Sequence, residues 1–389
     1  MHRLARLLAP ASIAVVGGRP AELAIQQCLA LGFEGEVWPV HPTRSELAGR
    51  ATVPSVADLP GPPDAALVAV NRHETIEVVA ALAAIGAGAA VCYASGFAEV
   101  GGAGIDLQAD LVAAARSMPV VGPNCYGTVA ATVGAALWPD QQGLRRCQRG
   151  VALVTQSGNI ALNLTMQSRR MPISHVLTVG NQADVGIEEC VEALVGDPSV
   201  SAIGLHVEAL GDVPRFEAAC RRASAADVPV VVLKTGSSIL GARIAVSHTS
   251  SLVGDATAYR ALFERLGVRQ VDSIPELLDT LAVLHRLGGI PGRRLVSMSC
   301  SGGEASVVAD QAESMDLDFP AFDDAHGARI ADTLSELVSV SNPLDYHTFI
   351  WGDPERLRAT FTAVLDGPLD AAMLVLDFPS AGLDDSGWW

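Results

Sequence analysis

A single histidine, His248, lies in a run of small and hydroxyl-bearing residues, Ser247–Asp255. No second histidine or cysteine stands near it at zinc-ligand spacing, so the run does not indicate a zinc site. A histidine in such a loop can be a base, a nucleophile or a hydrogen-bonded bystander. Because the chain also contains small-residue turns of the kind that bind phosphate, the pattern favours a histidine that accepts a phosphoryl group.

Two of these turns are candidate phosphate sites. One follows the apolar strand 151–154, the other follows the strand 294–299, and each opens a helix. The free N–H groups and dipole of a helix start would hold a phosphate, although the serine of the first turn can equally be a simple cap. The candidate residues are Ser157, Gly158, Asn159, Gly302 and Gly303.

Glu208 ends another apolar strand, 205–208. A carboxylate at that position can orient a histidine through its far ring nitrogen. The alternative is an ordinary solvated strand end.

The first strand of the chain runs into Gly17, Gly18 and Arg19, a weak version of a dinucleotide-binding turn without G-x-G-x-x-G. The second strand ends at Val40 and His41, where an NAD site would carry an acidic residue. The turn is therefore either a plain tight turn or a site for a nucleotide-like ligand other than NAD. A further turn, Gly122–Gly127, follows the fifth strand, where open α/β sheets bind ligands.

Apolar strands separated by helical stretches recur along the whole chain, which indicates parallel sheets covered on both faces. We predict an α/β fold of three consecutive Rossmann- or flavodoxin-like, doubly wound domains, the third incomplete. The predicted boundaries are 1–130, a linker over 131–150, 151–288 and 289–389. The last segment has few strands, so either the third domain is small or the chain is the front part of a longer one; we favour the second interpretation.

Composition narrows the functional classes. The formal net charge of −17 argues against a nucleic-acid or anionic membrane surface. Seven scattered cysteines without a CxxC pair indicate reduced thiols and a cytoplasmic protein. The N-terminus lacks the features of a signal peptide, and no apolar run is long enough to predict a transmembrane helix.

Taken together, the motifs resemble the NDP-forming acyl-CoA synthetases, the superfamily of ADP-forming acetate–CoA ligase and succinyl-CoA synthetase. The histidine loop is the specific part of the resemblance, which extends over the whole chain. The segments that carry it are Ser12–Gly18, Gly32–Val40, Ser95–Glu99, Gly122–Gly127, Thr155–Gly158, Gly180–Val185, Ser247–Gly254, Ser301–Gly303 and Asn342–Asp345.

The resemblance implies that a carboxylic acid, CoA and ATP give acyl-CoA, ADP and phosphate through an acyl phosphate and a phosphohistidine at His248. Glu208 would hold the second ring nitrogen of that histidine. The implied CoA-binding residues are Gly17, Gly18, Arg19, Val40, Asn71, Ser95, Gly96, Phe97, Pro123, Asn124 and Cys125.

The resemblance also implies partners. ATP or ADP with Mg would bind an ATP-grasp domain on a second subunit or a missing C-terminal part, in a homo- or hetero-oligomer. The implied small molecules are a small carboxylic acid or its acyl-CoA, with no metal ligands in this chain, no nucleic acid and no membrane.

The sequence departs from the family pattern in three places. The loop Gly17–Pro20 is short, Asn71 replaces a usual proline, and Ser250 replaces a glycine. Two alternatives therefore stay open: a non-catalytic CoA- or acyl-CoA-binding regulatory module, and an NAD-dependent oxidoreductase.

Overall fold

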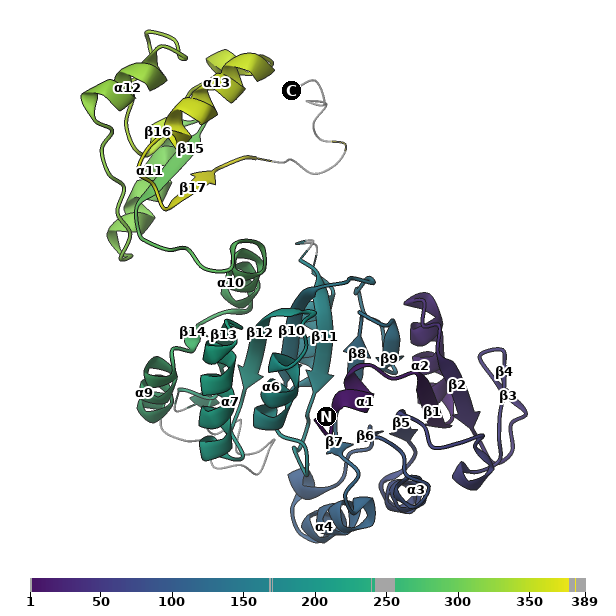
Figure 1. Cartoon of the computed structure of the whole chain (residues 1–389). Coiled ribbons are helices and arrows are strands. Elements are labelled where there is room, and N and C mark those ends of the chain that lie inside the picture. Colours follow the sequence, from purple (N-terminus) through teal and green to yellow (C-terminus); the bar gives the residue numbers. More distant parts are fainter. Residues whose placement is uncertain are drawn as a thin grey trace. The chain divides into compact units, whose positions relative to one another are not determined.

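The computed structural model describes residues 2–167, 169, 171–238, 240–241, 256–377 and 382. It divides into two compact units, Met1–Gly288 and Gly289–Trp389 (Figure 1). His248 and the rest of its loop lie outside the described residues. The predicted α/β fold of parallel, helix-covered sheets is confirmed in both units.

The first unit opens with a five-stranded parallel sheet in the order β2-β1-β5-β6-β7. Its strands and a small adjoining hairpin are β1 (Ser12–Gly17), β2 (Glu36–Val40), β3 (Glu46–Leu47), β4 (Arg50–Ala51), β5 (Ala65–Ala69), β6 (Ala90–Cys92) and β7 (Val120–Val121). Its helices are α1 (Ala5–Leu8), α2 (Arg19–Ala30), α3 (Arg72–Ala84), α4 (Ala103–Ala115) and the short 3-10 turns η1 (Val56–Asp58) and η2 (Ala98–Val100).

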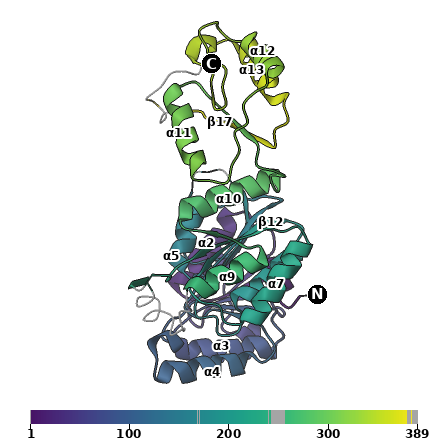
Figure 2. The same cartoon turned by 90° about the vertical axis from the view of Figure 1, so that its left-hand side faces the viewer.

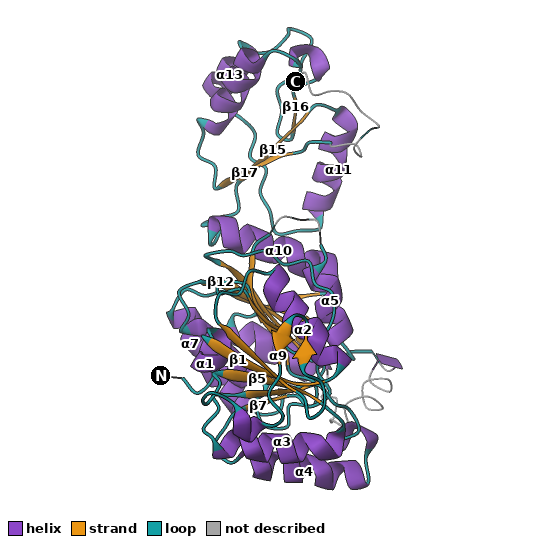
Figure 3. Ribbon diagram, turned by 90° about the vertical axis from the view of Figure 1, so that its right-hand side faces the viewer, coloured by secondary structure: helices purple, strands orange, loops and turns teal. Residues whose placement is uncertain are grey.

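Each strand of this sheet sends alternate side chains to two different cores. On one face, Val16 and Val68 pack with Val79 of α3 and Leu111 of α4, and these two helices lie side by side against the strands (Figure 3). On the other face, residues such as Val15 join a larger core that includes α2 and continues into the second sheet. The continuous apolar strands are therefore explained by burial on both faces.

The second sheet has seven strands in the order β14-β13-β12-β10-β11-β8-β9. The strands are β8 (Thr128–Ala130), β9 (Ala135–Leu137), β10 (Gly150–Thr155), β11 (Ile173–Thr178), β12 (Val200–Val207), β13 (Val230–Lys234) and β14 (Arg269–Val271). The helices are α5 (Gly158–Thr165), α6 (Ile187–Val195), α7 (Val213–Ala225), α9 (Ala256–Leu266) and α10 (Ile274–Leu287). Helices α7 and α9 lie along the same side of the unit (Figure 2).

The structure differs from the predicted linker over 131–150. Strands β8 and β9 form an antiparallel hairpin on the edge of the second sheet, with β8 paired to β11. The Sγ of Cys28 in α2 donates to the Ala136 carbonyl oxygen at 3.1 Å. The second sheet therefore begins before the predicted boundary at residue 130, with β8. Through Ala136, the hairpin also contacts α2, which packs on the first sheet.

The second unit holds a three-stranded parallel sheet in the order β16-β15-β17. Its elements are β15 (Leu295–Ser299), α11 (Gly302–Glu313), α12 (Asp324–Ala331), β16 (Leu344–Asp345), η3 (Thr348–Ile350), α13 (Pro354–Leu365) and β17 (Ala371–Leu374). A separate core around Val296, Leu344 and Tyr346 holds it together. Across both units, none of the helices within the described ranges has the length and apolarity needed to cross a membrane.

Candidate functional site

One cavity of about 920 Å³ lies at the carboxyl ends of strands from both sheets of the first unit. Residues that follow β1, β5, β6, β7, β10, β11 and β12 all reach its wall. The carboxyl ends of parallel strands are where open α/β sheets bind ligands. The lining residues are Pro20, Ala69, Val70, Asn71, Arg72, Tyr93, Ala94, Ser95, Asn124, Cys125, Tyr126, Gln156, Ser157, Gly158, Asn159, Gly180, Asn181 and Glu208.

Eight of the predicted site residues share this wall although they come from distant parts of the sequence. They are Asn71, Ser95, Asn124, Cys125, Ser157, Gly158, Asn159 and Glu208. Among the described residues, seven other predicted CoA contacts are not in the lining: Gly17, Gly18, Arg19, Val40, Gly96, Phe97 and Pro123.

The start of α2 explains the first glycines. Gly17 has φ +135°, and a Cβ there would overlap the carbonyl group of Ala69 in the neighbouring strand. Gly18 is the N-cap residue, receives no side-chain cap, and faces open space. Pro20 has no N–H, so the donors that this helix start leaves to an anion are the N–H groups of Arg19 and Ala21, next to the cavity that Pro20 lines. The Arg19 side chain is exposed, and Val40 is buried in the sheet.

The start of α3 is closed in a different way. The Asn71 side chain accepts hydrogen bonds from the N–H groups of His73 and Glu74, both at 3.1 Å. Asn71 therefore occupies the N–H groups that an anion would otherwise bind at this helix start. The next residue, Arg72, donates to the Gly96 carbonyl oxygen at 2.8 Å and is the one cationic side chain in the described lining of the cavity.

The loop Ser95–Glu99 is held by its own carboxylate. Glu99 accepts from the N–H groups of Gly96 (2.5 Å) and Phe97 (3.1 Å) and from Nδ2 of Asn181 (2.5 Å). The Phe97 side chain is fully buried in the core under α3 and α4. Within this loop, Ser95 is the predicted CoA contact that reaches the cavity, while Gly96 and Phe97 shape the loop.

The turn Gly122–Gly127 joins the two sheets. Asn124 has φ +58° and donates from Nδ2 to the Asn181 side chain at 3.3 Å. Gly180 faces the Pro123 and Asn124 carbonyl groups so closely that a Cβ would overlap them. Burial raises the pKa of the Cys125 thiol to about 12, so this cysteine stays a thiol and is a poor nucleophile.

The predicted phosphate turn after β10 forms a regular helix start. Ser157 is the N-cap of α5 and accepts from the Ile160 N–H at 3.4 Å. Gly158 is required by close packing, because a Cβ there would lie 2.8 Å from Cγ of Tyr126 and closer still to two other ring atoms. The N–H groups of Gly158 and Asn159 are orphan donors of a helix start and can hold an anion.

Glu208 lies across from this helix start and is positioned through its backbone. The Gln156 Oε1 accepts from the N–H groups of Glu208 (2.5 Å) and Ala209 (3.0 Å). Buried Lys234 donates to the Glu208 carbonyl oxygen at 2.9 Å, and its amine stands 4.7 Å from the Tyr259 ring centroid. Neither Gln156 nor Lys234 stood out in the sequence, because their partners are far away along the chain.

A different histidine, His206, lies in β12 just before Glu208. Its two ring nitrogens each lie 3.0 Å from a threonine hydroxyl, Thr155 and Thr235. Burial, together with the Lys234 charge, lowers the pKa of His206 to about 4. This histidine is neutral, buried and fully bonded, and so it is structural.

The second predicted phosphate turn, in the other unit, has an unfavourable charge environment. Ser301 caps α11 by accepting from the Gly303 N–H at 3.2 Å. Burial and the carboxylates of Asp377 and Asp345 raise the pKa of Glu304. A Cβ on Gly302 would lie 3.3 Å from an oxygen of Asp345. Carboxylates at this helix start repel phosphate, so the structure gives Gly302 and Gly303 no support as phosphate ligands.

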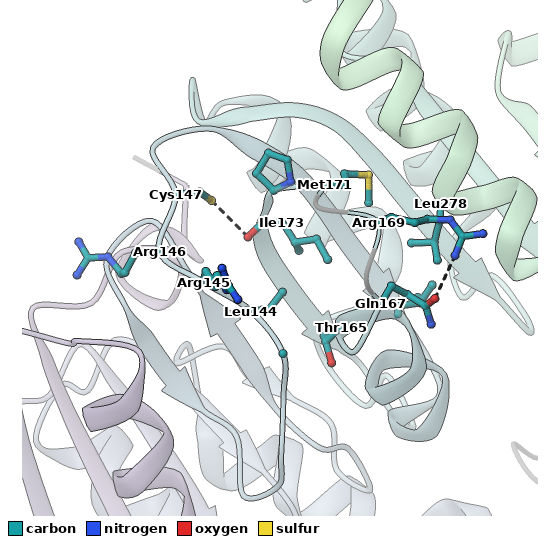
Figure 4. Close-up of a pocket in the computed structure, with 13 residues that line it drawn as sticks. Leu144, Arg145, Arg146, Cys147, Thr165, Gln167, Arg169, Met171, Ile173 and Leu278 are labelled. Carbon is teal, nitrogen blue, oxygen red and sulfur yellow. Dashed lines mark hydrogen bonds between the residues drawn. The ribbon is translucent and has the colours of Figure 1, made fainter. Parts of the chain in front are cut away.

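A second cavity, of about 690 Å³, lies at the amino end of β11 in the first unit (Figure 4). Two of the three arginines that line it bond within the protein: Arg169 pairs with Asp279 at 2.7 Å, and Arg146 donates to the Gly32 carbonyl oxygen at 2.8 Å. None of the predicted site residues that the structure describes lines this cavity.

Comparisons with known proteins agree with the geometry. Residues 11–131 match a model of a CoA-binding domain, and residues 148–284 match a succinyl-CoA ligase-like flavodoxin domain. A trans-feruloyl-CoA synthase from an unknown prokaryotic organism is 32% identical over 98% of this chain. Subunit alpha of acetate–CoA ligase [ADP-forming] I of Pyrococcus furiosus is 29% identical over 88% of this chain. This chain is homologous to the ADP-forming acyl-CoA ligases.

The homology extends to structure. The chain superimposes on a dinucleotide-forming acetyl-coenzyme A synthetase 1 of Candidatus Korarchaeum cryptofilum, solved with phosphate and ADP, with a TM-score of 0.85 and 27% identity, covering 95% of this chain and 81% of that one. The present chain is shorter than these relatives. It spans 56% of the length of the trans-feruloyl-CoA synthase and 76% of the Pyrococcus subunit alpha.

Proposed function

We propose that this chain is the CoA-binding and phosphoryl-accepting part of an ADP-forming acyl-CoA ligase. The observation that carries the proposal is that three parts of the chain line one cavity: Pro20 at the start of α2, the start of α5, and Glu208. A CoA-binding helix start and a phosphate-binding helix start on one cavity fit a reaction that joins CoA to a phosphorylated acid. The relatives are named as CoA ligases or synthases for acetate, ferulate and 4-hydroxybutyrate, so their names do not select one acid.

The proposed reaction has three balanced steps. A ring nitrogen of His248 takes the γ-phosphoryl group of ATP, and ADP leaves. A carboxylate oxygen of the acid then attacks that phosphorus, which gives an acyl phosphate and returns a neutral imidazole. Finally the CoA thiol attacks the acyl carbon, the acyl–oxygen bond breaks, inorganic phosphate leaves, and the thiol proton passes to that phosphate or to solvent.

The residues of this chain bind and orient the reactants. The open N–H groups at the start of α2 and the Arg72 guanidinium supply the positive field for the CoA phosphates. The N–H groups at the start of α5 stabilise the phosphoryl group while it moves. Glu208 would accept a hydrogen bond from the second nitrogen of His248, which keeps the attacking nitrogen unprotonated.

ATP and Mg would bind an ATP-grasp domain outside residues 1–389, in a homo- or hetero-oligomer. The Pyrococcus homologue carries the name subunit alpha, which supports a partner subunit. The metal would neutralise charge on the ATP phosphates.

Phosphoenzyme formation tests the proposal. The chain, mixed with its ATP-grasp partner and radiolabelled ATP, should acquire phosphate that is acid-labile and base-stable. His248→Ala should abolish the label, whereas His206→Gln should retain it. Normal labelling of the His248→Ala protein would contradict the proposal.

The same preparations separate the two alternatives. A non-catalytic CoA-binding module would bind CoA in a calorimeter but never acquire phosphate. An oxidoreductase would bind NAD in place of CoA. We expect the chain to bind CoA, not NAD, and to become phosphorylated.

A further inference from the structure

A wall of aromatic rings stands beside the phosphate-binding helix start. Tyr126 and Tyr93 both line the cavity, with their ring centroids 6.3 Å apart in an edge-to-face arrangement. Behind Tyr126 lies Trp138, which is fully buried, with its centroid 5.6 Å away. The Trp138 indole N–H donates to the Gln141 carbonyl oxygen at 3.2 Å. The ring of Tyr126 is therefore held from behind and has a fixed position.

This pair of rings lies next to the start of α5, where the proposed function puts the phosphoryl group. Tyr126 packs directly on Gly158, the first residue of α5, because the backbone there approaches the ring too closely to allow a Cβ. If the start of α5 holds the phosphoryl group, as the proposed function requires, the acid's carboxyl group must reach the same point. A body attached to that carboxyl group then has the Tyr126 and Tyr93 rings beside it in the same cavity.

We infer that Tyr126 and Tyr93 form the acyl-binding wall and that the substrate is a carboxylic acid with an aromatic body. This inference rests on the proposed function. Aromatic rings bind other rings by offset stacking or edge-to-face contact, a geometry that a methyl group cannot provide. The cavity, of about 920 Å³, has room for more than an acetyl group beside a phosphate. The half-buried tyrosines would lose more exposed surface to a ring than to a methyl group.

Calorimetry with the purified 1–389 chain tests this inference through CoA, acetyl-CoA and benzoyl-CoA. We expect benzoyl-CoA to bind about tenfold more tightly than acetyl-CoA. Tyr126→Leu should bring that ratio close to one, and Tyr126→Phe, which keeps the ring, should retain it. Circular dichroism would show whether each variant is folded, and Tyr93→Leu provides a second measurement if Tyr126→Leu is not.

Two results would overturn the inference while leaving the proposed function intact. One is equal binding of acetyl-CoA and benzoyl-CoA by the unmodified chain. The other is a preference for benzoyl-CoA that survives in both Tyr126→Leu and Tyr93→Leu. Failure of CoA itself to bind would instead overturn the proposed function, and this inference with it.

Discussion

The amide oxygen of Gln156 accepts hydrogen bonds from the backbone N–H groups of Glu208 and Ala209, at 2.5 and 3.0 Å. Gln156 stands just before the start of α5, whereas Glu208 follows β12, so one buried side chain fixes the spacing between two strand ends. The helix start proposed to bind phosphate and the carboxylate proposed to orient His248 are thereby held at a fixed spacing. Positioning of this kind is a large part of catalysis in phosphoryl transfer.

Replacing Gln156 should damage both stability and chemistry. Gln156→Ala leaves the Glu208 and Ala209 N–H groups without their acceptor, which should lower the free energy of unfolding by about 1–3 kcal/mol. Because Glu208 then loses its fixed position, labelling of His248 by ATP should also slow. Urea denaturation and the phosphoenzyme assay measure the two effects. Asn159→Ala, at an exposed position three residues on, is the stability control; an equal loss in that variant would contradict the argument.

The contact between Gly158 and Tyr126 predicts a coupled pair of substitutions. Gly158→Ala places a methyl group inside the Tyr126 ring, so the ring or α5 must shift, at a cost of about 1–3 kcal/mol. Tyr126→Ala removes the obstacle. The double variant should therefore be less destabilised than the sum of the two single variants, a difference that a double-mutant cycle in urea measures. Simple additivity would show that the two residues do not touch.

Many of the strands could be predicted from the sequence, because each central strand is a short, continuous apolar run. The apolar runs that predicted strands at 151–154 and 294–299 coincide with β10 (Gly150–Thr155) and β15 (Leu295–Ser299). Strands β8 and β9 were missed because each has three residues, too few for a periodic pattern. What fixes β8 is its pairing with β11, which is more than 40 residues away in the sequence, and β9 in turn pairs with β8.

The site was predictable in its turns and not in its contacts. Ser157 and Glu208 stand at strand ends, which the sequence displays, and the structure brings both to one cavity. The role of Asn71 as a helix cap and the burial of Phe97 depend on side-chain directions that a motif does not reveal. Arg72 was missed because one arginine among the chain's 26 Lys and Arg residues carries no signal until the cavity is seen.

Arg72 should matter for CoA binding more than the arginine that the sequence selected. Arg72→Gln removes the cationic side chain from the cavity wall, and we expect CoA affinity to fall about tenfold to a hundredfold, the usual loss for a hydrogen bond to a charged group. Arg19→Gln is the matched control, because Arg19 is exposed and does not line the cavity. Calorimetry in low and high salt measures both; equal losses in the two variants would show a long-range charge effect only.

The buried histidine His206 predicts how stability depends on pH. Its pKa falls from 6.5 to about 4 in the folded protein, mainly because burial disfavours the charged ring. Between those two values the unfolded chain binds a proton that the folded protein does not, so the free energy of unfolding decreases as pH falls from 6.5 towards 4. The full loss from this one group is about 3 kcal/mol, and it is absent above pH 6.5. Urea denaturation at a series of pH values measures the slope. His206→Gln, which cannot titrate, should flatten it, although burial also lowers the pKa of His175 and so leaves part of the slope in place. An unchanged slope in His206→Gln would mean that this ring is not held neutral between Thr155 and Thr235.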